Sequence, residues 1–170
     1  YDIWCDRGIS FANHIMGVAR ILFNFALRME HTTINPFSSI RRRATDRRKT
    51  VWSREHVKSF LDVAYSDFKT RNIGLIAHMA HAWCQRIGDM RLLVWDNIDM
   101  DKGQLNLEQS KRRSKVFLPI GDELYEMLLQ QKADFGFQQY VAPSIKPIQG
   151  KFNPYSLEGV SKIGRRVMKQ

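Results

Sequence analysis

The sequence predicts an α+β fold that is mainly helical and carries one three-stranded antiparallel sheet. Apolar residues recur at helical spacing in three long stretches, residues 10–27, 53–86 and 122–135. Between the second and third stretches, residues 94–119 hold three short segments, apolar or alternating in character, that are separated by turn-like sequences. Consecutive short strands joined by tight turns form an antiparallel meander, and this pattern predicts the sheet.

The first helix is expected to begin with Ser10 as its N-cap. Its apolar face comprises Ile15, Val18, Ala19, Leu22, Phe23, Ala26 and Leu27. Such a face needs a partner, and nothing else in the first 50 residues is expected to supply one. We therefore interpret this segment as the last helix of a domain whose earlier part is absent. A helix packed on the following domain fits the periodicity equally well.

Two helices are expected before the sheet. Ser53 is the expected N-cap of the first, whose face comprises Val57, Phe60, Leu61, Ala64 and Phe68. Asn72 is expected to open the second, which runs up to Arg86.

The strands are expected within residues 94–100, 104–109 and 115–119. A helix then begins at Gly121-Asp122 and runs to Phe135. An irregular, proline-containing segment follows, and a last helix begins near Ser156, with one face formed by Val160, Ile163 and Val167.

Composition restricts the class of partner. The chain has 170 residues, a net charge of +10 and 44% hydrophobic residues, which suffices for a packed domain. A charge of this size favours a polyanionic partner. No apolar run is long enough to cross a membrane. Cys5 and Cys84 are far apart and form no Cys-x-x-Cys pair, so we expect reduced thiols in a cytoplasmic protein.

Basic residues gather in three places. Residues 41–49 carry six positive charges and one negative charge, so half of the net charge lies in nine residues. A solvated linker is the ordinary interpretation, but this density favours a linker lying along a phosphate backbone. The turn at 110–114 is also strongly basic, and the last helix carries Lys162, Arg165, Arg166 and Lys169 on one face.

Arg86 has two apolar segments beside it, one ending at Cys84 and one beginning at Ile87. An arginine fixed between core elements suits phosphate binding, because its planar fork donates two hydrogen bonds at once. An ordinary helix-terminal arginine is the alternative.

Several ordered motifs together resemble the tyrosine recombinases, the phage integrase family. Residues 85–90 (QRIGDM) followed by 93–99 (LVWDNID) resemble the first catalytic box of that family. Residues 109–111 (QSK) and 116–120 (VFLPI) resemble its β-hairpin, and 35–37 (NPF) the junction between its two domains. The family usually has glycine and leucine before the arginine, where this chain has Cys84 and Gln85.

The resemblance implies a domain organisation and a reaction. Residues 1–34 would be the end of a helical core-binding domain, 35–50 a basic linker, and 51–170 the first part of a catalytic domain. The reaction would be site-specific DNA cleavage and rejoining through a phosphotyrosyl intermediate. Double-stranded DNA would be the partner, with self-association into a tetrameric synapse. No metal or other cofactor is expected.

The same resemblance implies a role for each matching residue. Arg86 would stabilise charge on the phosphate oxygens, and Lys111 would protonate the leaving oxygen, with Lys115 as the alternative acid. Asp89 would support Arg86. The DNA-binding residues would be Arg41, Arg42, Arg43, Arg47, Arg48, Lys49, Arg112, Arg113, Lys162, Arg165, Arg166 and Lys169.

The remaining boxes of the family have no match. All five histidines precede Lys111, and none belongs to a correctly placed His-x-x-Arg sequence. Tyr125, Tyr140 and Tyr155 precede the position of the nucleophile. We therefore expect a fragment that does not cleave DNA by itself.

Two other classes stay open. A non-enzymatic DNA-binding module needs only the basic clusters. A metal-dependent nuclease needs clustered carboxylates, and Asp96, Asp99 and Asp101 have turn-like spacing that argues against it. A zinc site at His78, His81 and Cys84 is disfavoured, because the three residues drift around the helix without a fourth ligand.

Overall fold

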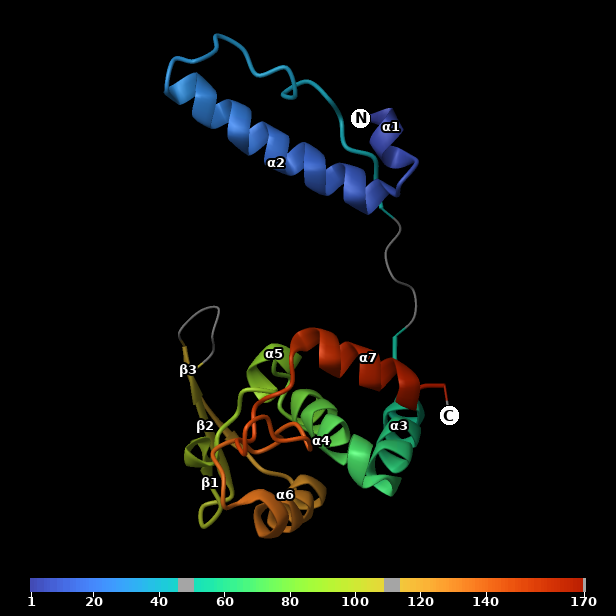
Figure 1. Cartoon of the computed structure of the whole chain (residues 1–170), viewed down its shortest axis with the longest axis vertical. Coiled ribbons are helices and arrows are strands. Elements are labelled where there is room, and N and C mark those ends of the chain that lie inside the picture. Colours follow the sequence, from blue (N-terminus) through green and yellow to red (C-terminus); the bar gives the residue numbers. More distant parts are fainter. Residues whose placement is uncertain (46–50, 109–113, 170) are drawn as a thin grey trace. The chain divides into compact units, whose positions relative to one another are not determined.

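A computed structural model of the chain describes residues 1–45, 51–108 and 114–169, and these form two units. Unit 1 comprises Tyr1–Val51 and unit 2 comprises Trp52–Gln170 (Figure 1). Residues 35–45, which the sequence predicts to be linker, thus belong to unit 1. In the described part of the chain, no helix is long and apolar enough to span a membrane.

Unit 1 contains the short helix α1 (Asp2–Cys5) and the long helix α2 (Ile9–Arg28). The expected N-cap at Ser10 is wrong: α2 begins at Ile9, and Gly8 occupies the cap position with a φ of 118° that favours glycine. At the other end, Glu30 adopts a φ of 58° and the His31 N–H donates to the Ala26 carbonyl at 2.9 Å. This left-handed residue closes the helix in a Schellman-type cap.

The segment that follows α2 returns along it and packs on it. The ring of Phe37 lies 5.0 Å from that of Phe23, edge to face. The Arg20 guanidinium donates to the backbone carbonyls of Phe37, Ser38 and Ile40. The expectation that the first 50 residues offer α2 no partner is therefore wrong, because aromatic packing and these hydrogen bonds hold the return segment in place.

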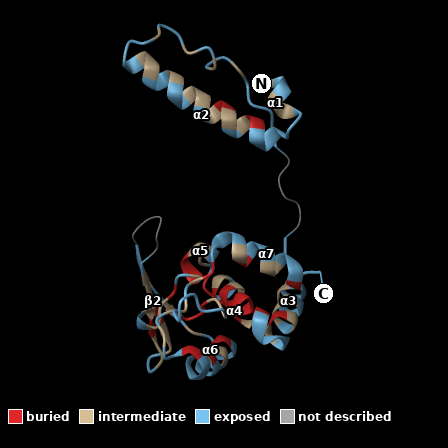
Figure 2. Cartoon of the chain, in the orientation of Figure 1, coloured by how far each residue is buried: buried red, intermediate tan, exposed pale blue. Residues whose placement is uncertain are grey.

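Much of the apolar surface of α2 nevertheless stays exposed. Ala12 and Met16 are its buried residues, while Val18, Ile21, Leu22 and Phe25 are at least half exposed. Figure 2 shows α2 mainly in the intermediate and exposed colours.

Unit 2 begins with two closely packed helices, α3 (Arg54–Ser66) and α4 (Phe68–Ala82). Ser53 caps α3 as predicted, accepting a hydrogen bond from the His56 N–H. The predicted start of α4 at Asn72 is wrong, because Asp67 accepts from the Lys69 N–H and starts the helix earlier. A side chain at Gly74 would lie 2.8 Å from Ala64 Cβ, so glycine permits the close packing of these helices.

The sheet follows the short helix α5 (Ile87–Met90). Its strands are β1 (Ile98–Asp99), β2 (Gln104–Glu108) and β3 (Lys115–Pro119), antiparallel in the order β1-β2-β3. The third strand matches its predicted bounds, whereas the first is much shorter than predicted. Residues 95–97 instead form the 3₁₀ helix η1 (Trp95–Asn97), because the Asn97 carboxamide accepts from the Val94 N–H and donates to the Asn106 carbonyl.

Two further helices complete unit 2, α6 (Asp122–Phe135) and α7 (Leu157–Val167). The bounds of α6 and the start of α7 are as predicted. The core lies around α4, and Figure 2 shows that helix largely in the buried colour. Its fully buried apolar residues include Ile73, Leu75, Ile76 and Met79, and they pack with Leu105 of β2 and Leu128 of α6.

The segment between α6 and α7 is tied down by buried amides. Asn72 donates to the Pro143 carbonyl at 2.7 Å, and Gln131 donates to Asn72 Oδ1 and to the Val141 carbonyl. Farther along, Pro143 and Pro154 form a β-bridge, and the Ser144 N–H donates to the Asn153 carbonyl. The irregular segment therefore has a defined course across the core.

Candidate active site

Arg86 lies at the N-cap of α5, directly after the cap of α4. Cys84 adopts a φ of 50°, and the Gln85 N–H donates to the Ala80 carbonyl at 3.1 Å. This Schellman-type turn reverses the chain, and the Arg86 carbonyl then accepts from the N–H groups of Asp89 and Met90. The backbone of Arg86 is thus fixed on both sides, as its apolar neighbours predict.

The side chain of Arg86 is paired with a buried carboxylate. Arg86 Nη1 lies 3.7 Å from Asp89 Oδ2, and the Asp89 side chain is only 7% exposed. The Arg86 side chain is 48% exposed. The pairing is electrostatic, because Asp89 Oδ2 has no hydrogen-bond partner among the described residues. The exposed part of the Arg86 side chain is open to an anion.

A second arginine joins α5 to the start of α7. Arg91 Nη1 donates to the Tyr155 carbonyl at 2.8 Å, and Ser156 immediately afterwards caps α7 by accepting from the Gly159 N–H. Leu157 also approaches α5 at Gly88, as the 3.9 Å separation from a Cβ built there shows. Sequence reasoning missed Arg91, because its partner is 64 residues away and no local pattern marks the pair.

The predicted basic face of α7 is at the surface. Val160 and Val167 are buried, and this orients the helix so that Lys162, Arg165 and Arg166 are exposed. Lys169, which the sequence predicts on the same helix face, instead lies exposed in the turn after α7 ends at Val167. In Figure 1, α5 and α7 lie at the same side of unit 2 as the end of β2 and the start of β3. Helices α5 and α7 and this end of the hairpin therefore share one side of the unit.

The hairpin places Lys115 at the start of β3, opposite Glu108 of β2. Lys115 is exposed. Lys111, Arg112 and Arg113 lie outside the described residues.

The arginines of the predicted linker differ in their contacts and exposure. Arg43 forms a 2.8 Å ion pair with Asp2, and its backbone N–H donates to the hydroxyl oxygen of Tyr1 at 2.7 Å. Arg42 lies against Gly17 of α2, and Arg41 is exposed. Arg47, Arg48 and Lys49 lie outside the described residues. At least Arg43 thus contributes to the fold of unit 1.

The tyrosines considered at the sequence level serve the fold. The Tyr125 hydroxyl donates to the Met100 carbonyl, and Tyr155 is 7% exposed. Tyr140 forms a β-bridge with Val94.

Residues weighed as metal ligands are engaged elsewhere. The Lys102 ammonium donates to Asp99 at 2.9 Å, and this hydrogen bond lowers the pKa of that carboxyl. His78 Nδ1 is hydrogen-bonded to the Tyr65 hydroxyl at 2.9 Å. Within the described ranges, no group of three or more histidine, cysteine, aspartate or glutamate side chains is arranged to hold a metal ion.

The fold is similar to that of solved DNA integrase and recombinase structures. Solved structures of lambda integrase superpose well on this chain. A dimer bound to a COC′ core site has a TM-score of 0.80 at 23% identity, covering 99% of this chain and 61% of that chain. A tetramer bound to a Holliday junction gives 0.80 at 23%, with 99% and 49% covered.

A more distant structure, XerA recombinase, gives a TM-score of 0.57 at 14% identity, covering 89% of this chain and 52% of that one. This chain thus spans about half the length of these proteins. No protein-family model and no curated protein sequence matches it. At these identities, the comparison shows a shared fold.

Proposed function

We propose that this chain is part of a tyrosine recombinase, which cleaves and rejoins DNA at specific sites. The observation that carries the proposal is the half-exposed Arg86 held by the buried Asp89, within the fold of lambda integrase. The lambda integrase structures are DNA complexes, one of them a tetramer. Double-stranded DNA and self-association on it are the corresponding proposals for this chain.

In this proposal, Arg86 stabilises the transition state of phosphoryl transfer. Negative charge gathers on the non-bridging phosphate oxygens, and the outward-facing donors of a pre-oriented guanidinium suit that charge. Lys111 protonates the departing 5′ oxygen as general acid, and Lys115 is the alternative. The attacking tyrosine is proposed to lie outside these 170 residues, since Tyr125 and Tyr155 are engaged in the fold.

The basic face of α7 is proposed to bind the phosphate backbone beside Arg86. Together with Lys169 in the turn after the helix, it presents four cations to solvent, and such contacts provide affinity without base preference. The exposed Arg41, together with Arg42, Arg47, Arg48, Lys49, Arg112 and Arg113, is proposed to bind DNA phosphates as well.

To test the proposal, the reading frame that encodes this chain is sequenced beyond Gln170 and the longer protein is expressed. A His-x-x-Arg sequence followed by a tyrosine is expected there. With that protein and a nicked duplex substrate, we expect a protein–DNA adduct that survives denaturation. Arg86→Ala should lower its rate of formation by about 10²–10³-fold, which is the usual loss for one charge-stabilising donor. Duplex affinity should change little.

A non-enzymatic DNA-binding module is the second candidate, and the exposed basic face of α7 favours it equally. The adduct distinguishes the two functions. For these 170 residues alone, we expect duplex binding that weakens steeply with salt and no adduct. An adduct at Tyr125, Tyr140 or Tyr155 would contradict the assignment of the nucleophile.

A further inference from the structure

The outer face of the sheet carries an exposed aromatic ring that the proposed chemistry does not use. Along β3, the alternation turns Val116 and Leu118 toward the core and leaves Phe117 on the opposite face, where it is 63% exposed. A phenylalanine in that position gains nothing from burial and presents its ring to solvent.

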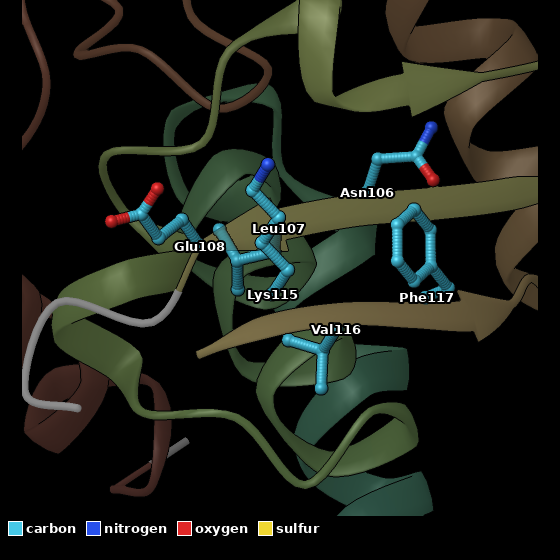
Figure 3. Close-up of a pocket in the computed structure, with 6 residues that line it drawn as sticks. All are labelled: Asn106, Leu107, Glu108, Lys115, Val116 and Phe117. Carbon is cyan, nitrogen blue, oxygen red and sulfur yellow. The ribbon is translucent and has the colours of Figure 1, made fainter. Parts of the chain in front are cut away.

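Polar groups accompany this ring on the same face. Asn106 of β2 is the direct cross-strand partner of Phe117, and Glu108 and Lys115 form the next pair on that face. Figure 3 shows the Asn106 carboxamide beside the Phe117 ring, with the Lys115 chain farther along the strands. Among the described residues, neither the Asn106 carboxamide nor the Lys115 ammonium has a hydrogen-bond or ion-pair partner, although Lys115 faces Glu108 across the strands.

These residues border an open pocket of about 260 Å³. Its lining comprises Asn106, Leu107, Glu108, Lys115, Val116 and Phe117 (Figure 3). The volume is below the roughly 300–1,000 Å³ of sites for drug-sized ligands, so it suits a single planar ring. The strands do not present a large apolar docking surface, because a single aromatic ring is bordered by an amide, a cation and a carboxylate.

From this arrangement we propose that the Phe117 face stacks one unpaired DNA base. The ring supplies the stacking surface, the Asn106 carboxamide hydrogen-bonds the exposed edge of the base, and Lys115 attracts the adjoining phosphate. Exposed aromatic residues on open sheets bind single-stranded nucleic acids in this way. Glu108 accepts from a base N–H group, such as N3–H of thymine, and repels a phosphate placed over it, which directs the backbone toward the Lys115 side.

The inference rests on the proposed function, because a reaction that breaks and exchanges strands exposes unpaired bases near the cut. It adds a binding site for single-stranded DNA to a protein whose proposed substrate is duplex.

The test measures binding of the 170-residue chain to a fluorescent oligothymidylate and to a duplex of unrelated sequence. Phe117→Ala should weaken oligothymidylate binding about tenfold, in line with the loss of one stacked base. Phe117→Trp should restore it, with the new indole fluorescence quenched on binding. The matched control is Phe137→Ala, because Phe137 is 74% exposed in the same unit but lies outside this sheet. That variant should bind both DNAs like the parent chain.

Each result decides between the proposals. If the parent chain binds no duplex at low salt, both the proposed function and this inference fail. If duplex binding persists and Phe117→Ala binds oligothymidylate like Phe137→Ala, the base-stacking site alone is overturned. A parent chain that self-associates without DNA, and loses this association in Phe117→Ala, would show that the face binds a second copy and would equally overturn the proposal. Circular dichroism of each variant checks that the fold is intact.

Discussion

Helix α2 is richer in apolar residues than α4 but is much less buried. Of the 20 residues of α2, only Ala12 and Met16 are buried, while the 15 residues of α4 include eight buried ones. Unit 2 surrounds α4 with α3, α6, α7 and the sheet, whereas the described part of unit 1 offers α2 only α1 and the return segment. An apolar stripe therefore shows that a helix needs partners, and it does not show whether they lie in the same chain.

The comparison predicts its largest effect for one matched pair of substitutions. Leu75→Ala in α4 removes a fully buried side chain and should lower the free energy of unfolding of unit 2 by about 2–5 kcal/mol. Leu22→Ala in α2 removes a side chain that is 61% exposed and should change the free energy of unfolding of unit 1 by no more than about 0.5 kcal/mol. Hydrogen exchange followed by mass spectrometry reports on each unit separately. A comparable loss of unfolding free energy in both variants would show that the apolar face of α2 is covered in solution.

Buried amides provide the second contrast. Asn72→Ala leaves the Pro143 carbonyl without its donor and removes one of the two acceptors of the Gln131 amide, and should lower the free energy of unfolding by about 1–3 kcal/mol. Asn24→Ala in α2 also removes a side-chain hydrogen bond, with Asn35, but this bond is exposed and water replaces it. Urea denaturation of both variants should show a lower midpoint for the α4 variant only. Equal midpoints would contradict the role assigned to the amide network.

The third contrast concerns pH. Burial lowers the pKa of His78 in α4, although Glu123 opposes the shift, and the neutral ring is hydrogen-bonded to Tyr65. Below the unfolded pKa of about 6.5, the unfolded state binds a proton that the folded state resists, so the stability of unit 2 falls as the pH falls. Denaturation midpoints between neutral pH and pH 5 should show this loss. His78→Gln should weaken the dependence of the denaturation midpoint on pH. An unchanged dependence would exclude His78 as its source.

The smallest effect is expected to be the same in both units. Glu30 after α2 and Cys84 after α4 both adopt positive φ at a helix end. Glycine avoids the left-handed strain but costs conformational entropy on folding, so Glu30→Gly and Cys84→Gly should each stabilise by less than about 1 kcal/mol. Thermal denaturation measures both. Destabilisation at Cys84 alone would mean that its side chain contributes contacts beyond the turn.

Local patterns predicted the elements whose causes are local. The bounds of β3 and α6 and the start of α7 follow from alternation and capping. The helix predicted to run up to Arg86 ends at Ala82 instead. The errors arose where a distant partner or one side chain decides the structure. Asn97 converts a strand-like sequence into η1, and Asp67 begins α4 before Asn72. The same holds for the site: Asp89 lies three residues from Arg86 and was predictable, whereas the Arg91–Tyr155 link was not.

The loop before α7 is anchored at both of its ends. Asn72 holds the Pro143 carbonyl, Arg91 holds the Tyr155 carbonyl, and the Pro143–Pro154 bridge joins the two ends to each other. The residues between these two ends form a loop that starts and ends at the core, so the length of the loop does not determine the position of α7. Insertions or deletions within residues 145–152 are therefore free to accumulate during evolution, since lengthening such a loop costs little closure entropy. The loop is a place where related proteins can diverge in sequence and size while Arg86 and the α7 face keep their spacing.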